Sequence, residues 1–153
     1  MSLFLVQHGK SLSKEVDPEQ GLSDEGRSET EEIASAAEAR GLWIDRIIQS
    51  GKKRAAQTAE IFAFRLHPTG GVQMMDGLNP LDNVASFAEK INASENLMLV
   101  GHLPFMERMA SFLITGAEDK PVIRFQNSGI VCLERDENSG HWTIRWTLFP
   151  RIG

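Results

Sequence analysis

The sequence is poor in several features that mark particular classes of protein. Its single cysteine, Cys132, excludes a disulfide within the chain and fits a reducing compartment. Its formal net charge of −5 argues against a general binding surface for nucleic acid or anionic membrane. The apolar run near the N-terminus is too short for a signal peptide or a membrane span. We therefore expect a cytoplasmic protein that binds neither nucleic acid nor membrane.

Repeats, low-complexity stretches and interior linkers are also missing from the sequence. Hydrophobic residues make up 41% of the chain and charged residues 24%, which is ordinary for a globular protein. Residues 1–153 are therefore predicted to form one domain. Because the chain as a whole is acidic, any site for an anion has to be a local pocket of positive charge.

Short apolar runs alternate with amphipathic segments through most of the chain. Strands are predicted at 3–6, 44–49, 72–75 and 96–100, and helices at 24–40, 53–66, 84–91 and 105–115. Three further runs, 122–125, 130–134 and 142–148, predict strands in the tail. This order predicts an α/β fold with three layers, in which a mostly parallel mixed sheet has helices on both faces and an antiparallel edge.

Three of the predicted strands end in similar chemistry. The first ends in VQHGK with Gln7 and His8, the second in QSGKKRAAQT with Arg54, and the third in VGHLP with His102. Ligands of open α/β sheets bind beyond the carboxyl ends of the strands, so these side chains are predicted to meet in one crevice. Two imidazoles, a guanidinium and nearby lysines suit a phosphoryl group, which needs charge-assisted donors and a nucleophile in line.

The remaining histidines and the cysteine lack such a setting. His67 and His141 fall in turns and are predicted to lie at the surface. Cys132 is predicted to be a small residue of the core. No ligand spacing in the sequence supports a zinc site, and no metal or other cofactor is expected.

The three motifs LFLVQHGKS, SGKKRAAQTAE and LMLVGHLP resemble, in this order, those of the histidine phosphatase superfamily, whose fold is phosphoglycerate mutase-like. The short length and the tail after position 124 resemble its small SixA-type phosphohistidine phosphatase branch. The resemblance covers nearly the whole chain. It implies a hydrolase without a metal, and the lack of long insertions makes a mutase the least favoured activity.

The resemblance also implies roles for individual residues. His8 would attack phosphorus and form a phosphohistidine intermediate that water hydrolyses, while Arg54 and His102 would hold the phosphoryl oxygens. Gly9 would let the backbone pass close to the phosphate. The other residues expected to bind the substrate are Gln7, Ser11 and Lys53.

Gln7 departs from the family pattern, which has arginine at this position. An amide can donate to a phosphoryl oxygen but carries no charge, and a lost charged hydrogen bond is worth roughly 1.5–3 kcal/mol. Lys10, Lys52 or Lys53 could restore some of the charge, although a lysine cannot copy the planar guanidinium fork. We therefore expect reduced rather than abolished activity.

Three functions remain open from the sequence. The first is a phosphohistidine phosphatase acting on a phosphorylated protein. The second is a phosphatase for a small phosphorylated metabolite, which needs a general acid; Asp76 and Asp82 are the candidates, with turn or helix-cap roles as their alternative. The third is a module that binds phosphate or a phosphoprotein without turnover, because of Gln7. The oligomeric state does not follow from the sequence.

Overall fold

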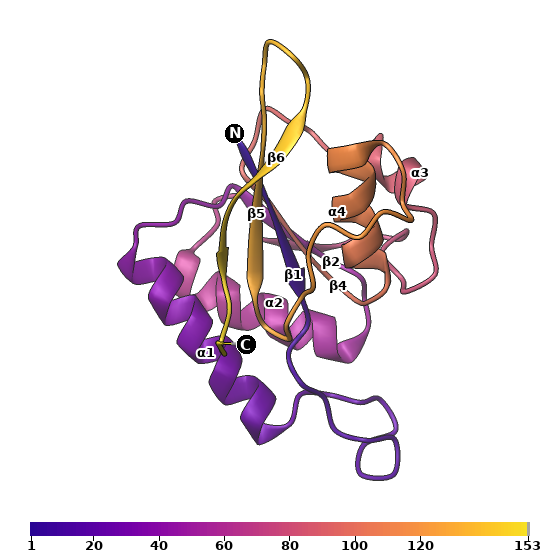
Figure 1. The fold of residues 1–153 in the computed structure, drawn as a ribbon. Helices are drawn as coiled ribbons and strands as arrows, with labels where there is room; N and C mark the ends of the chain where they lie inside the picture. The colour runs from indigo at the N-terminus through magenta and orange to yellow at the C-terminus, as the bar shows by residue number, and fades with distance from the viewer. Residues whose placement is uncertain (153) are drawn as a thin grey trace.

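The computed structural model describes residues 1–152, which form a six-stranded sheet with helices on both sides (Figure 1). The strands are β1 (Ser2–Gln7), β2 (Arg46–Gln49), β3 (Val72–Met74), β4 (Leu97–Gly101), β5 (Ile130–Arg135) and β6 (Trp142–Leu148). The helices are α1 (Asp24–Ala39), α2 (Lys53–Leu66), α3 (Val84–Ala88) and α4 (Phe105–Thr115). All four predicted helices are present. None of the helices within residues 1–152 is long and apolar enough to cross a membrane.

The sheet has the strand order β3-β2-β4-β1-β5-β6. Strands β1 to β4 are parallel to one another, whereas β5 is antiparallel to β1, and the edge strand β6 is antiparallel to β5. This arrangement confirms the predicted mixed sheet with an antiparallel edge. Because β2, β4 and β1 are adjacent and parallel, the three motifs that follow them lie at one edge of the sheet.

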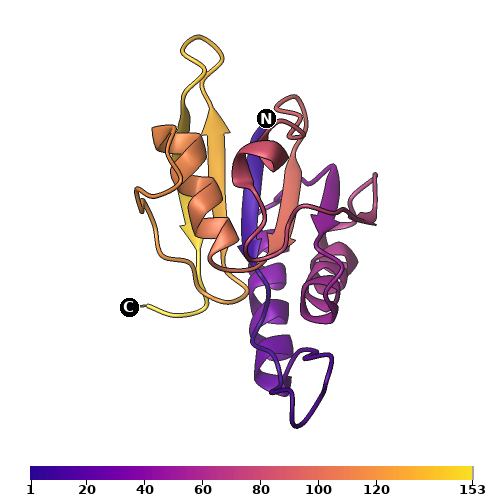
Figure 2. The ribbon, with the colours of Figure 1, turned by 90° about the vertical axis from the view of Figure 1, so that its right-hand side faces the viewer.

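Alternate residues of the central strands enter two separate cores. Phe4 and Val6 of β1 pack with α1 and α2, whereas Leu3 and Leu5 pack with α3 and α4. Figure 2 shows α3 and α4 in front of the sheet and α1 and α2 away from them. The predicted burial of both faces is therefore confirmed, as is the burial of Cys132.

One predicted strand, 122–125, is not a strand in the structure. The segment runs beside α4, and the amide of Phe125 donates to Glu107 of that helix at 2.8 Å instead of joining a ladder. The Phe125 side chain packs into the core that α4 shares with the sheet. The apolar pattern of this segment thus predicted correctly that its side chains pack on the core, but it predicted a strand wrongly. A loop whose side chains pack on the core carries the same apolar pattern.

Helix α1 begins against the backbone that follows β1. Ser23 caps the helix by accepting a hydrogen bond from the Gly26 amide at 3.0 Å, and its own amide donates to the Lys10 carbonyl at 3.0 Å. A Cβ atom added at Gly26 would lie 2.0 Å from the Lys10 carbonyl oxygen. The close approach of the helix to the segment after His8 therefore depends on glycine at position 26.

Replacing Gly26 by alanine should destabilise the protein by about 1–3 kcal/mol, because the added methyl group has to push α1 away from the Lys10 backbone. Urea unfolding would measure the change, with Ser28→Ala on the exposed side of α1 as the control. Alanine favours a helix over glycine by about 1 kcal/mol in the absence of a clash. An unchanged or increased stability of Gly26→Ala would therefore contradict the close approach.

Candidate active site

His8 lies directly after β1 with a fixed ring orientation. Its amide donates to the Gly101 carbonyl of the neighbouring strand β4 at 3.0 Å, and its carbonyl accepts from Asn127 Nδ2 at 2.9 Å. The ring nitrogen Nδ1 lies 2.6 Å from the Gly9 carbonyl oxygen, which can only accept. Nδ1 must therefore carry the proton, and the lone pair of the neutral ring lies on Nε2.

The structure brings Arg54 and His102 to His8 as predicted. Arg54, in the first turn of α2, donates from Nε to His8 Nε2 at 3.3 Å. His102, between β4 and α4, stacks obliquely on His8, with ring centroids 5.0 Å apart and ring planes at 52°. The three side chains come from separate segments of the chain and form one cluster at the carboxyl edge of the sheet.

Both histidines of the cluster favour the neutral form. Burial lowers the pKa of His8 below its ordinary value of 6.5; the hydrogen bond to the Gly9 carbonyl raises this pKa in part, and the nearby Arg54 charge lowers it. Burial lowers the pKa of His102 to about 3, with smaller contributions from His8, Arg54 and Lys52. A neutral imidazole is what a nucleophile requires, since the protonated ring has no free lone pair.

Ser50 also belongs to this cluster, although it is not among the predicted site residues. Its Oγ lies 2.6 Å from His102 Nε2, and His102 is only 1% exposed. The other ring nitrogen, Nδ1, is buried and has no partner among the described residues. Ser50 therefore restrains the His102 ring, and a hydroxyl at the end of β2 was the only signal for it in the sequence.

Gly9 also has structural contacts that do not depend on a bound phosphate. Its amide donates to Thr58 Oγ1 of α2 at 2.9 Å, which ties the segment after His8 to that helix. A Cβ at this position would lie 2.8 Å from Thr30 Oγ1 and 3.0 Å from Ser128 Oγ. The lack of a side chain thus lets α1 pack tightly on the backbone. Thr58 and Asn127 were not predicted, because nothing in their local sequence links them to His8.

Gln7 lies at a hollow beside the cluster, and its Oε1 is buried without a hydrogen-bond partner in the described residues. Two cations line the same hollow, but both are neutralised by carboxylates of α1. Lys10 lies 2.7 Å from Glu25, and Arg151 lies 2.6 Å from Glu25 and 3.0 Å from Glu29. The cations around Gln7 are therefore already paired and are poor replacements for an arginine.

Two other predicted binding residues have structural contacts of their own. Lys53 forms an ion pair with Asp17 at 2.9 Å and lies 3.7 Å from Glu19, and the bond to Lys53 lowers the pKa of Asp17 to about 2. Ser11 forms an isolated antiparallel bridge with Leu22. Of the lysines expected to restore charge, only Lys52 has no carboxylate within 4 Å among residues 1–152.

Neither candidate general acid contacts the histidine pair by a hydrogen bond within residues 1–152. Asp82 Oδ2 accepts from the Asn79 amide at 2.8 Å and so closes a turn before α3. Asn83, rather than Asp82, caps that helix by accepting from the Ser86 amide. Asp76 is exposed to solvent. In the part of the chain that is described, no three His, Cys, Asp or Glu side chains come together as a metal site.

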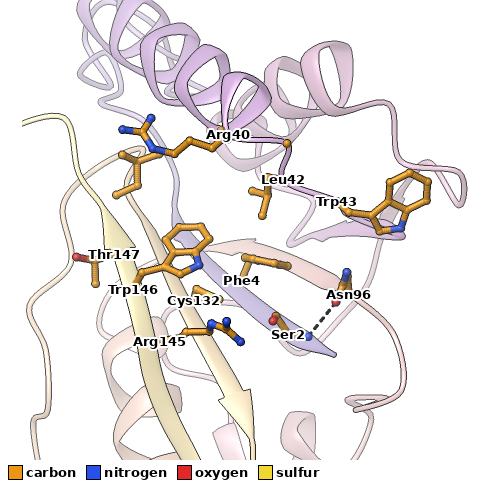
Figure 3. Close-up of a pocket in the computed structure, with 13 residues that line it drawn as sticks. Ser2, Phe4, Arg40, Leu42, Trp43, Asn96, Cys132, Arg145, Trp146 and Thr147 are labelled. Carbon is orange, nitrogen blue, oxygen red and sulfur yellow. Dashed lines mark hydrogen bonds between the residues drawn. The ribbon is translucent and has the colours of Figure 1, made fainter.

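A separate groove of about 490 Å³ lies near the amino end of β1 and contains none of the predicted site residues (Figure 3). Its floor is aromatic, with the Phe4 and Trp146 rings 5.9 Å apart, and Arg40 and Arg145 lie at its sides. Arg145 is paired with Glu134. The groove is therefore distinct from the cluster around His8.

Comparison with known proteins found relatives that are similar in sequence and in structure, although no protein-family model matches the chain. The chain is 26% identical to phosphohistidine phosphatase SixA of Escherichia coli (strain K12), over 98% of this chain and 94% of the relative. It is 30% identical to an uncharacterised protein of Picosynechococcus sp., over 76% of this chain and 74% of that protein. A solved structure of the protein histidine phosphatase SixA complexed with tungstate has a TM-score of 0.82 at 26% identity, covering 98% of this chain and 97% of that one.

The protonation of the histidine pair can be measured directly by ¹⁵N NMR of the side chains. We expect the His8 ring to titrate with a midpoint below pH 6.5 and to carry its proton on Nδ1 in the neutral form. The His102 ring should titrate with a midpoint of about pH 3. The exposed His67 and His141 supply reference signals in the same spectra. A His8 midpoint at or above pH 6.5 would contradict the burial of the pair.

Proposed function

The chain belongs to the histidine phosphatase superfamily, and from this membership we propose that it is a metal-independent phosphatase with His8 as its nucleophile. The observation that carries the proposal is the orientation of the His8 ring. With Nδ1 bonded to the Gly9 carbonyl, the nucleophilic lone pair is on Nε2, beside Arg54. Arg54 donates to this lone pair, so its guanidinium has to turn to a phosphoryl oxygen for Nε2 to attack phosphorus.

The reaction proceeds in two displacements at phosphorus. His8 Nε2 forms a bond to phosphorus as the bond to the leaving group breaks, and the leaving group departs with the bonding electron pair and takes up a proton. Water then attacks the phosphohistidine, which releases phosphate and returns the neutral ring. Arg54 and His102 stabilise the charge on the phosphoryl oxygens in both steps, and the buried setting strengthens these bonds.

A phosphohistidine is the substrate favoured by the surroundings of the pair. Asp82 is occupied in a turn and Asp76 is exposed, so no carboxylate is held at the cluster as a general acid within residues 1–152. An imidazole leaves more readily than an alkoxide, so a phosphohistidine substrate needs such an acid least. The E. coli relative named phosphohistidine phosphatase SixA supports the same substrate. A phosphorylated protein is accordingly the proposed partner.

Gln7 supports a second candidate function, the capture of phosphate without turnover. Where the superfamily pattern has a charged donor, this chain has a neutral amide, and the two cations that line the hollow with it are paired with carboxylates. Loss of one charged hydrogen bond slows catalysis by about 10- to 150-fold if it acts only on the transition state. Because this loss alone does not abolish catalysis, we rank phosphatase activity above pure binding.

Removing the proposed nucleophile should abolish turnover. We expect His8→Ala to reduce hydrolysis of p-nitrophenyl phosphate and of a phosphohistidine peptide to background in the presence of EDTA, because the variant lacks the imidazole that forms the phosphohistidine intermediate. His67→Ala, at an exposed histidine, should match the wild type. Full activity of His8→Ala would overturn the mechanism. Phosphate binding that depends on Arg54 and His102, without turnover by the wild type, would establish the binding module.

Restoring the missing charge should increase the rate. We expect Gln7→Arg to raise kcat by up to about 150-fold, since the guanidinium adds a charged donor to the transition state. Gln7→Lys should give a smaller gain, because an ammonium group supplies charge without the planar fork. Steady-state rates with p-nitrophenyl phosphate measure both changes. If Gln7→Arg is no faster than the wild type, then Gln7 is not at the phosphoryl site.

A further inference from the structure

A hollow of about 760 Å³ opens beside Arg54 and is bordered by two segments that are distant in sequence. One is the loop between β1 and α1, which contributes Lys14 and Glu19. The other is the start of α2, which contributes Lys52 and Lys53 next to Arg54. Arg54 both lines the hollow and donates to His8, so this side chain connects the hollow with the proposed nucleophile.

The hollow is positively charged, although the chain as a whole is acidic. Four cations and one carboxylate, Glu19, line it, in a chain with a formal net charge of −5. Lys53 is held by Asp17 and Glu19, but Lys14 and Lys52 are exposed and have no carboxylate within 4 Å in residues 1–152. Two free ammonium groups therefore face whatever approaches His8 from this side.

Exposed apolar side chains lie on the segments next to this hollow. Val16, in the loop that carries Lys14, is 70% exposed, and Met74 at the end of β3 is 64% exposed. Met74 lies against the rim of the hollow, because a Cβ on Gly51 would be 2.8 Å from its sulfur atom. Cations with methionine and aliphatic side chains are typical of the surfaces by which proteins bind one another.

We propose that this hollow is the docking surface for the acidic face of a phosphorylated protein, whose phosphohistidine reaches His8 past Arg54. The inference rests on the proposed function and names the side from which the partner binds. A small polyanion would need a fixed cage of donors, whereas every residue that lines the hollow is exposed or half-buried. Mobile surface lysines instead attract and orient a large acidic partner.

Two synthetic phosphohistidine peptides test the proposal, one with glutamates around the phosphohistidine and one with glutamines in their place. We expect the wild type to have a higher kcat/KM for the acidic peptide, and roughly 0.5 M salt to remove this preference by screening. Lys14→Glu and Val16→Asp should each lower the acidic-peptide rate by about three- to tenfold relative to the p-nitrophenyl phosphate rate. Lys120→Glu, the same charge change beyond the far end of α4, should leave the ratio unchanged.

The outcomes separate failure of the docking surface from failure of the proposed function. Turnover of both peptides without preference, or an equal effect of Lys120→Glu, would overturn the docking surface and leave the phosphatase standing. Pyrophosphate serves as a small polyanionic substrate for comparison. If Lys14→Glu lowers the rate with pyrophosphate as much as it lowers the rate with the acidic peptide, the hollow binds a small polyanion instead. Turnover of neither peptide, nor of p-nitrophenyl phosphate, would overturn the phosphatase itself.

Discussion

The hydrogen bond from the His8 amide to the Gly101 carbonyl, 3.0 Å long, extends the parallel ladder between β1 and β4, and the whole candidate site depends on that ladder. It places His8 beside His102, which follows β4 directly. Strand β2 on the other side of β4 brings Ser50 and Arg54 to the same edge. Three short motifs separated by about forty residues each thus become one cluster, because neighbouring parallel strands end together.

The second constraint is electrostatic. The site must attract a phosphoryl group, yet its nucleophile has to stay neutral. Burial depresses the pKa of both imidazoles, and the guanidinium of Arg54 adds to the effect at each of them. Burial therefore keeps the nucleophile unprotonated, and the positive charge that would hold the phosphate acts in the same direction. The Gly9 carbonyl raises the pKa of His8, but it fixes this ring in place as Ser50 fixes the ring of His102.

Charge around the site is divided unequally. On the side of Gln7, Lys10 and Arg151 are bound to Glu25 and Glu29, so that side is close to neutral. On the side of Arg54, Lys14 and Lys52 have no carboxylate within 4 Å in residues 1–152. The positive charge that is not neutralised by carboxylates therefore lies on the α2 side of the crevice and not on the side of Gln7.

Periodicity and motifs alone determined much of this protein. Apolar runs and cap residues predicted four helices and six of the seven proposed strands within about three residues, because local burial and capping leave a local pattern. The three motifs predicted His8, Arg54 and His102 as one cluster. The tertiary structure alone decided what has no local pattern. It turned 122–125 into a loop beside α4, paired Lys10 and Lys53 with carboxylates, and brought Ser50, Thr58 and Asn127 to the histidine pair. These contacts join segments far apart in the chain, so their partners cannot be read from neighbouring residues.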